Sequence, residues 1–247
     1  MSSGTLNSLL PIADLGGAVT ELSAEGGDAF ASSGIRPFVL AALIAEQPAN
    51  STLVVAGDDR SARELRDDIA EWLAPRRVLV YPTRGVDSGS HLAPPPHLVG
   101  LRLAALEALV GGEGTHGAPV VVASAVALAE RVPESALRPA SIRLVKAEPL
   151  DLEATLAALV EAGYERVDQV AARGQFAVRG GILDLYPTTS EHALRVDLFG
   201  DEIESMRWFS TFTQRSLGDI EVVEVAPAAE LAAEHRELAE IAALEDL

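Results

Sequence analysis

The stretch Tyr164–Pro187 reads YERVDQVAARGQFAVRGGILDLYP and contains three short runs with the composition of β-strands. These runs are Tyr164–Val170, Gln175–Val178 and Gly181–Tyr186, and Arg173–Gly174 supplies a turn between the first two. The runs follow one another without a crossover helix, which parallel neighbours would need. The stretch therefore predicts antiparallel pairing in an α+β region.

The flanking sequence extends this pattern in both directions. Downstream, Leu194–Phe199 and Ile203–Phe209 flank Gly200–Asp201–Glu202, which predicts a hairpin because glycine tolerates positive φ. Upstream, Asp151–Ala162 has apolar residues at helical spacing, and Gly163 follows as a C-cap. One helix and a series of antiparallel strands are expected here.

Residues 36–131 follow a different pattern, in which apolar strands alternate with amphipathic helices. The expected strands are Thr52–Ala56, Val78–Tyr81 and Val120–Ala123, and the expected helices are 36–45, 61–73, 98–109 and 125–131. Ser61 is expected to begin its helix because Glu64 completes a capping box with it. This alternation predicts an α/β domain with a parallel sheet.

Three segments follow from these patterns. Residues 1–135 are expected to form the first part of the α/β domain, and residues 136–215 an α+β insert. Residues 216–247 contain one more strand, Glu221–Val225, and an acidic helix, Ala228–Leu244. Both elements are expected to return to the α/β domain.

Composition excludes several classes of function. The net charge is −18, which disfavours direct binding to DNA because such binding depends on Lys and Arg at phosphates. No apolar run is long enough to cross a membrane, and the N-terminus lacks a secretory signal. With no cysteine in the chain, disulfides are impossible and a cytoplasmic location is expected.

The chain also lacks the residues of a nucleotide-hydrolysing loop. Its only lysine is Lys146, and no GxxxxGK[ST] sequence surrounds it. A P-loop needs that lysine at the β- and γ-phosphates. Residues 31–34 precede a helix, where such a loop would lie, but they offer no cation. ATP turnover by this chain is therefore not expected.

No other catalytic, cofactor or metal site is predicted. The five histidines have no pair at metal-ligand spacing, and Gly-x-Ser-x-Gly is absent. Asp58 and Asp59 follow a predicted parallel strand, where carboxylates can bind magnesium. Acidic residues are also common at a helix N-terminus, and that reading is favoured here.

Arginines gather in the predicted insert, where Arg166, Arg173 and Arg179 lie within fourteen positions of one another. Arginine and aromatic residues are enriched at interface hot spots, so these arginines and Phe176 are candidates for binding a protein partner. The alternative is that the arginines pair locally with the carboxylates of Glu165, Asp168 and Asp184. The residues alone leave the two readings equal.

A resemblance to a known family favours the partner-binding reading of these arginines. The Gly-Tyr-x-x-Val-Asp-Gln-Val form at 163–170, the run LRVDLFGDEIESMRWF at 194–209 and QRSL at 214–217 resemble the UvrA-interaction domain shared by UvrB and transcription-repair coupling factors. The first form points to the coupling factors. Shorter matches lie upstream in the family's order: GDDR at 57–60, VYP at 80–82, LRL at 101–103 and AERVP at 129–133. The resemblance covers about residues 50–225 and fails at 83–96.

The resemblance implies a helicase-like α/β domain with a degenerate nucleotide loop, interrupted by a docking insert. It implies that the chain recruits UvrA in transcription-coupled nucleotide excision repair, with Arg166 and Arg179 on one face contacting UvrA. Arg173 and Phe176 are weaker extensions of that contact. RNA polymerase and DNA would be bound by other domains of the family, outside this sequence. The competing hypotheses are a nucleotide-binding or helicase fragment and a module that binds damaged DNA directly.

Overall fold

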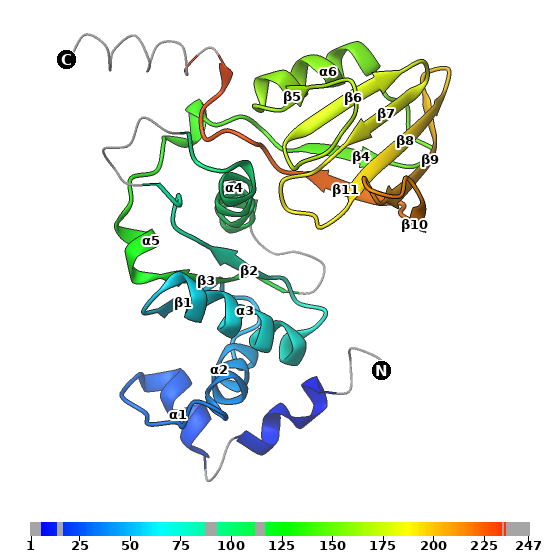
Figure 1. Ribbon diagram of the computed structural model, residues 1–247. Coiled ribbons are helices and arrows are strands. Elements are labelled where there is room, and N and C mark those ends of the chain that lie inside the picture. The colour runs from blue at the N-terminus through cyan, green and yellow to red at the C-terminus, as the bar shows by residue number, and fades with distance from the viewer. Residues whose placement is uncertain (1–5, 14–16, 87–92, 112–116, 234, 236–247) are drawn as a thin grey trace, which may run out of the picture. The chain divides into compact units, whose positions relative to one another are not determined.

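The computed structural model of the chain describes residues 6–13, 17–86, 93–111, 117–233 and 235 (Figure 1). Contacts divide the chain into two compact units. The first comprises residues 1–83 and 105–130, and the second comprises residues 84–104 and 131–247. No helix in the described ranges is long and apolar enough to cross a bilayer.

The first unit is built on a three-stranded parallel sheet, as the alternating sequence pattern predicted. Its order is β1 (Thr52–Ala56), β3 (Val120–Ser124), β2 (Val78–Tyr81). All five residues of the central strand β3 are buried, which explains the apolar run Val120–Ala123 that precedes Ser124. β1 and β2 form the two edges among the described strands.

Helices pack on both faces of this sheet. They are α2 (Arg36–Ala45), α3 (Asp59–Leu73) and α5 (Ala125–Ala129), together with the second half of α4 (Pro96–Gly111). η1 (Asn7–Ala13) and α1 (Ala18–Glu25) pack against α2. One core joins α2 and α3 to the sheet through Ile44, Ile69 and Val120. A smaller cluster on the other face contains Val121 and Ala105.

Helix α3 begins two residues earlier than the capping box at Ser61 predicted. Asp58 is the N-cap, and its Oδ1 accepts a hydrogen bond of 2.8 Å from the Ser61 N–H. The Ser61 hydroxyl donates to the second carboxylate oxygen of Asp58 at 3.1 Å. Ser61 thus supports a cap that an ionised carboxylate provides one turn upstream.

The second unit contains a six-stranded sheet in the order β10-β9-β8-β7-β6-β5. The strands are β5 (Glu165–Arg166), β6 (Gln175–Arg179), β7 (Ile182–Leu185), β8 (Ala193–Phe199), β9 (Glu202–Phe209) and β10 (Ser216–Asp219). All neighbours are antiparallel except β5 and β6, which are parallel. Figure 1 shows the long β8–β9 hairpin in yellow and orange.

Two details of this sheet differ from the sequence-based expectation. The run Tyr164–Val170 forms only the two-residue strand β5, because the chain then bends and buries Val170 in a small cluster with Phe209, against which Val167 packs partly buried. The predicted hairpin after Phe199 is confirmed. Phe199 pairs with Glu202, and Gly200 has φ +66°.

One face of the six-stranded sheet forms the main core of the second unit. α6 (Leu152–Glu161), β4 (Ile142–Val145) and β11 (Val222–Val225) supply the covering side chains. The fully buried residues include Leu159, Phe176, Leu183, Leu185, Leu194, Val196, Ile203 and Met206. β4 was not predicted from the sequence, and it joins this core through Leu144.

β11 does not return to the parallel sheet as the sequence reading expected. It pairs antiparallel with β4, with Val225 opposite Ile142 and Val222 opposite Val145. Val223 and Val225 are buried against the core of the insert, and this burial explains the pairing. Of the acidic helix expected at 228–244, residues 228–232 form no helix, and residues 236–247 lie outside the described part.

The segment after β11 is held by buried polar contacts within the second unit. The Tyr164 hydroxyl donates to the Ala226 carbonyl at 2.7 Å, and burial raises the pKa of Tyr164 to about 12. Glu230 accepts hydrogen bonds from Arg84 and from the fully buried Arg102 of α4. Glycine at position 100 allows α4 to pack closely, since a Cβ there would lie 2.0 Å from the Thr188 Oγ1.

Candidate protein-binding site

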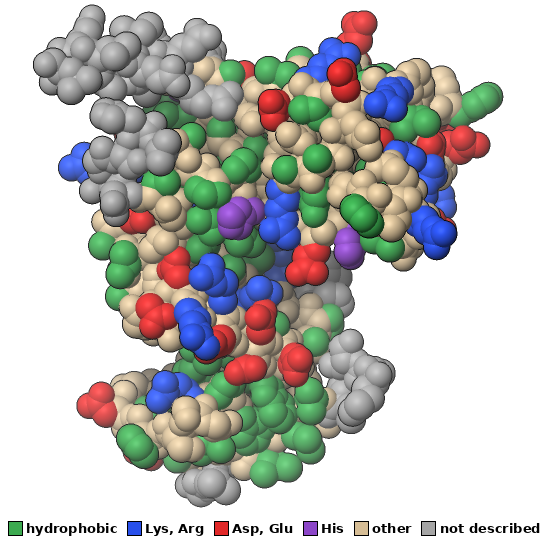
Figure 2. Space-filling view, viewed as in Figure 1, with side chains coloured by type: hydrophobic (Ala, Val, Ile, Leu, Met, Phe, Trp, Pro, Cys, Tyr) green, Lys and Arg blue, Asp and Glu red, His purple; other side chains and the backbone are tan. Residues whose placement is uncertain are grey.

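The face of the six-stranded sheet opposite α6 carries most of the polar side chains of its strands. We call this surface the outer face. It consists of the residues that alternate away from the main core: Gln175, Ala177, Arg179, Ile182, Asp184, Ala193, Arg195, Asp197, Ser205, Arg207 and Phe209. Figure 2 shows Lys and Arg side chains gathered along the right-hand margin, over β8–β10.

Two ion pairs organise the middle of the outer face. Arg195 Nε and an Arg195 terminal nitrogen donate to the two oxygens of Asp184 at 2.6 and 2.8 Å. This bidentate pair raises the pKa of Arg195. Arg207 lies beside Arg195 in the same cross-strand row, and its terminal nitrogens pair with Asp197 in the next row. The guanidinium carbon of Arg195 lies 4.6 Å from the centre of the Phe209 ring, within cation–π range.

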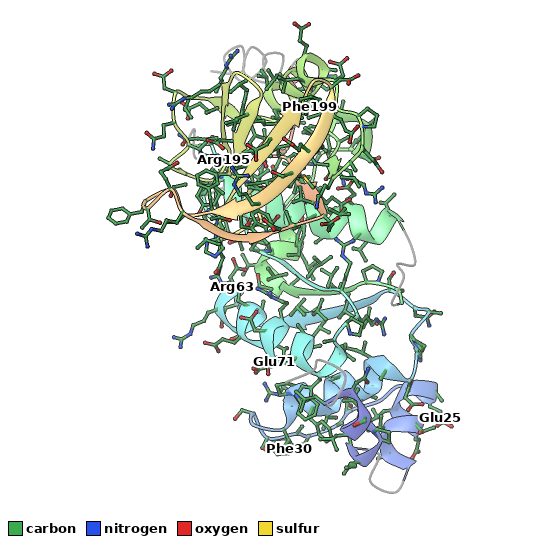
Figure 3. All side chains as sticks on the ribbon, turned by 90° about the vertical axis from the view of Figure 1, so that its right-hand side faces the viewer. Glu25, Phe30, Arg63, Glu71, Arg195 and Phe199 are labelled. Carbon is green, nitrogen blue, oxygen red and sulfur yellow. The ribbon has the colours of Figure 1, made fainter. Side chains whose placement is uncertain are left out.

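These pairs fix the position of the arginines without removing them from solvent. The side chains of Arg195 and Arg207 keep 22% and 30% of their exposure. Figure 3 labels Arg195 on the yellow strands that face the viewer. A pre-positioned, partly hydrated guanidinium loses less conformational freedom on binding than a free one, so such a surface suits a protein partner that presents carboxylates.

Of the residues predicted from the sequence, Arg166 and Arg179 are both exposed. Arg166 lies on β5, at the edge of the sheet, and has no hydrogen bond or ion pair with other residues in the described part of the chain. Arg179 ends β6 and donates a hydrogen bond of 2.6 Å to the main-chain carbonyl of Asp168.

The expectation that Arg166 and Arg179 share one face is corrected by the register. Arg166 lies opposite Phe176 across the β5–β6 pair, so its side chain starts on the side of the main core. Arg179 is three residues beyond Phe176 on a strand without a bulge, so it projects to the outer face. The two arginines can share a binding surface only around the edge formed by β5.

Arg173 and Phe176 have less freedom than the sequence suggested. Arg173 is half-buried and donates from Nε to the Ser190 carbonyl at 2.6 Å. Phe176 is 0% exposed in the main core, so its side chain is not available for direct contact. Its predicted role as a contact residue is wrong for the folded chain, because alternation along β6 turns it inward.

The alternative reading, in which the three predicted arginines pair with nearby carboxylates, named the wrong partner for Asp184. Asp184 pairs with Arg195 rather than with Arg166, Arg173 or Arg179. The sequence reading missed Arg195 and Arg207. Their signal was the alternation of polar and apolar residues in LRVDLF and in SMRWF, which places charges on one face of each strand.

The carboxylates Asp58 and Asp59 of the first unit have structural roles. The sequence reading placed these acidic residues at a helix N-terminus, and Asp58 is the N-cap of α3. Asp59 accepts hydrogen bonds from Ser124 Oγ at 2.5 Å and from the Thr83 N–H and hydroxyl at 2.9 and 2.6 Å. Burial alone would raise the pKa of Asp59, but these hydrogen bonds outweigh it, so the pKa is lowered. Asp59 thus ties together the carboxyl ends of all three parallel strands.

Comparison with known proteins matches the second unit to a protein family. Residues 142–231 match the family described as the UvrB interaction domain, and the match begins at the first residue of β4. Its limits enclose the six-stranded sheet, α6 and the β4–β11 pair.

A longer region is similar to curated proteins named transcription-repair-coupling factor. The chain is 33% identical to that of Bacillus subtilis over 200 residues, which is 81% of this chain and 17% of the relative. It is 36% identical to that of Mycobacterium bovis over 203 residues and 35% identical to that of Escherichia coli over 199 residues, covering 78% and 77% of this chain and 16% of each relative. The chain thus spans about one-sixth of the length of these relatives. Residues 142–231 are therefore a UvrB interaction domain, within a chain that is homologous to transcription-repair-coupling factors over about four-fifths of its length.

Proposed function

We propose that this chain is a docking module that binds UvrA in transcription-coupled nucleotide excision repair, and that it binds without catalysing a reaction. The observation that carries the proposal is the combination of a UvrB interaction domain with an outer face whose arginines are held in place and partly exposed. The first unit serves as the scaffold that carries this insert. Contacts to RNA polymerase and DNA are assigned to other parts of the family's proteins.

The contact surface that we propose runs around the β5 edge of the sheet. Arg166 projects from that edge, and Arg179 projects from the adjoining corner of the outer face. Arg195 and Arg207, which are held by their ion pairs, extend the surface across the outer face. Arg173 has a supporting role, because its hydrogen bond to Ser190 fixes the loop beside the edge. Acidic groups on the partner would match this arrangement.

The test is titration of purified UvrA against the chain and its variants by calorimetry. Arg166→Ala and Arg179→Ala are expected to weaken binding by tenfold or more each, while thermal unfolding stays unchanged because both side chains are exposed. Arg60→Ala is the matched control. It removes the same charge from an exposed position of α3 in the other unit and is expected to leave the affinity unchanged.

The result that would remove the proposal is a wild-type chain that fails to bind UvrA at low ionic strength. Equal losses from Arg60→Ala and Arg166→Ala would show a nonspecific charge effect instead of a site. Arg195→Ala and Arg207→Ala distinguish the two halves of the surface. A loss with them alone would confine the contact to the outer face and exclude the edge.

A further inference from the structure

The chain between β5 and β6 lies against the outer face of the six-stranded sheet. We call residues 167–174 the β5–β6 loop. Val170 of this loop is 2% exposed, in the small cluster with Ala177 and Phe209 of the outer face. The guanidinium of Arg195 lies over the Phe209 ring on the same face. The β5–β6 loop is therefore packed against the surface that we propose as the contact site, although its residues form no helix or strand.

The β5–β6 loop also fixes the direction of Arg179. A terminal nitrogen of Arg179 donates to the main-chain carbonyl of Asp168 at 2.6 Å. Because this acceptor belongs to the main chain, the position of the guanidinium follows the path of the loop and not the rotamer of another side chain. Arg179 is exposed, and a guanidinium carries several N–H donors, so this bond leaves others to meet a carboxylate of a partner.

The side-chain amide of Gln175 holds the middle of the β5–β6 loop. Its Oε1 accepts hydrogen bonds from the N–H groups of Ala171 and Ala172 at 3.1 and 3.0 Å. Its Nε2 donates to Glu165 Oε2 on β5 at 3.1 Å. The reverse orientation of the amide would bring its NH2 group against two main-chain N–H groups, so these contacts determine which end faces the loop. Gln175 thus ties the loop to the strand that precedes it.

These side-chain bonds are separate from the bonds that build the strand. The carbonyl of Gln175 accepts from the Tyr186 N–H at 2.9 Å, and its main chain pairs with β5 opposite Glu165. Strand β6 therefore keeps its register without the amide. The amide determines the conformation of the β5–β6 loop and, through the carbonyl of Asp168, the position of Arg179.

We propose that Gln175 is a positioning residue for the binding of UvrA. By holding the β5–β6 loop, it keeps the Asp168 carbonyl where Arg179 donates to it, so the guanidinium is already directed when a carboxylate of the partner approaches. A pre-positioned side chain loses less conformational freedom on binding, which raises the affinity without an added contact. This inference rests on the proposed function and adds to it a residue that acts through Arg179.

The test is a double-mutant cycle measured by calorimetric titration of UvrA against the whole chain. Gln175→Ala is expected to weaken binding about fivefold, because the β5–β6 loop no longer holds Arg179 in one position. In the Arg179→Ala background the same change is expected to weaken binding less than about twofold, since the guanidinium that it positions is already absent.

The matched control is Gln47→Ala. The side chain of Gln47 also bridges two segments, because its Nε2 donates to the main-chain carbonyl and the hydroxyl of Ser23, but it lies in the first unit. This variant is expected to bind UvrA as the wild type does. Thermal unfolding of Gln175→Ala is expected to shift by only a few degrees, so a loss of affinity reports the site and not the fold.

A swapped pair of side chains tests the positioning role directly. Gln175→Glu alone keeps an acceptor for the loop but sets a second carboxylate against Glu165, and it is expected to weaken binding severalfold. Adding Glu165→Gln restores a donor and an acceptor between the two positions at unchanged net charge, and the affinity is expected to return to within about twofold of wild type. Amide exchange followed by NMR reports on the loop itself. Ala171 and Ala172 are expected to exchange at least tenfold faster in Gln175→Ala and near the wild-type rate in the swapped pair.

The outcomes separate this inference from the proposed function. Additive losses in the cycle, or full affinity in Gln175→Ala, overturn the inference and leave the proposed function standing. A swapped pair whose Ala171 and Ala172 amides are protected as in wild type, but whose affinity stays low, also overturns it, because the loop is then in place without restoring the contact. A wild-type chain that does not bind UvrA removes the proposed function and this inference together.

Discussion

The two sheets of the molecule place polar and apolar side chains in opposite ways. In the parallel sheet, the carboxylate Asp59 is turned inward to tie three strand ends together, and the apolar residues Leu53 and Val55 are exposed on β1, an edge strand among those described. In the six-stranded sheet most apolar residues fill the main core, and paired charges occupy the outer face beside a small apolar cluster that contains Phe209. The first arrangement fits a role in holding the sheet together, and the second fits a surface that recognises charge.

The largest effect on stability is expected from truncating a buried side chain in the main core of the six-stranded sheet. Phe176→Ala is expected to lower the free energy of unfolding by about 3–5 kcal/mol, because a fully buried aromatic ring leaves a cavity. Chemical denaturation measures the loss. Phe176→Leu is the control, expected to retain both the fold and UvrA affinity. A large loss of UvrA affinity in a well-folded Phe176→Leu protein would restore direct contact by this ring.

The buried charges of the second unit test whether its interior depends on ion pairing as well. Glu230→Ala removes the carboxylate that accepts a hydrogen bond from the buried guanidinium of Arg102. The expected loss is about 3 kcal/mol, at the low end for a broken buried pair, because the partly exposed Arg84 can turn to solvent. Arg84→Ala in the same denaturation experiment should cost less than half as much. Equal costs would mean that Arg84 carries the interaction.

The hydrogen bonds that Asp59 accepts in the parallel sheet can be tested through the pH dependence of stability. The pKa of Asp59 is lowered in the folded chain, so its contribution is complete above its unfolded pKa of about 3.9 and is lost as pH falls through the lower folded value. Asp59→Asn is expected to cost about 1–3 kcal/mol at neutral pH. The difference between wild type and variant should shrink below pH 4 in thermal unfolding. A difference that stays constant down to pH 2 would contradict this account.

The outer face should give the smallest effect on stability. Arg195→Lys keeps the charge but loses the bidentate geometry with Asp184 and the planar contact with Phe209. The expected cost is about 1 kcal/mol, because the pair remains partly hydrated. A cost above 3 kcal/mol would place Arg195 among the structural residues of the core and would weaken its assignment to a binding surface.

Local sequence patterns were sufficient for the elements whose cause is local. The apolar runs of β1, β2 and β3 and the glycine of the hairpin after Phe199 specify their own conformations, and the structure confirms them. The pairing of β4 with β11 was not predictable in this way. These strands lie about eighty residues apart, and each carries only four residues, so no short-range pattern links them.

The candidate site likewise has features with a local signal in the sequence and features that depend on strand pairing. The concentration of arginine in the insert was visible in the sequence, but the direction of each side chain depends on register. Phe176 was read as an interface aromatic, although Val178, Leu183 and Leu185 already share its alternation and mark the buried face. Arg195 and Arg207 were overlooked because their carboxylate partners lie on neighbouring positions of the sheet and not nearby in the chain.

The pairing of β4 with β11 has a consequence for how the insert can be inherited. Its first and last strands lie side by side, with Ile142 opposite Val225, so the chain enters and leaves the insert at points about 5 Å apart. An insert whose two ends lie this close can replace a surface loop of another protein, because neither end has to pass through the core of that protein. The insert is therefore joined to the rest of the chain at one place in its own sheet, and its close contacts with α4 are the part that a new host would have to supply.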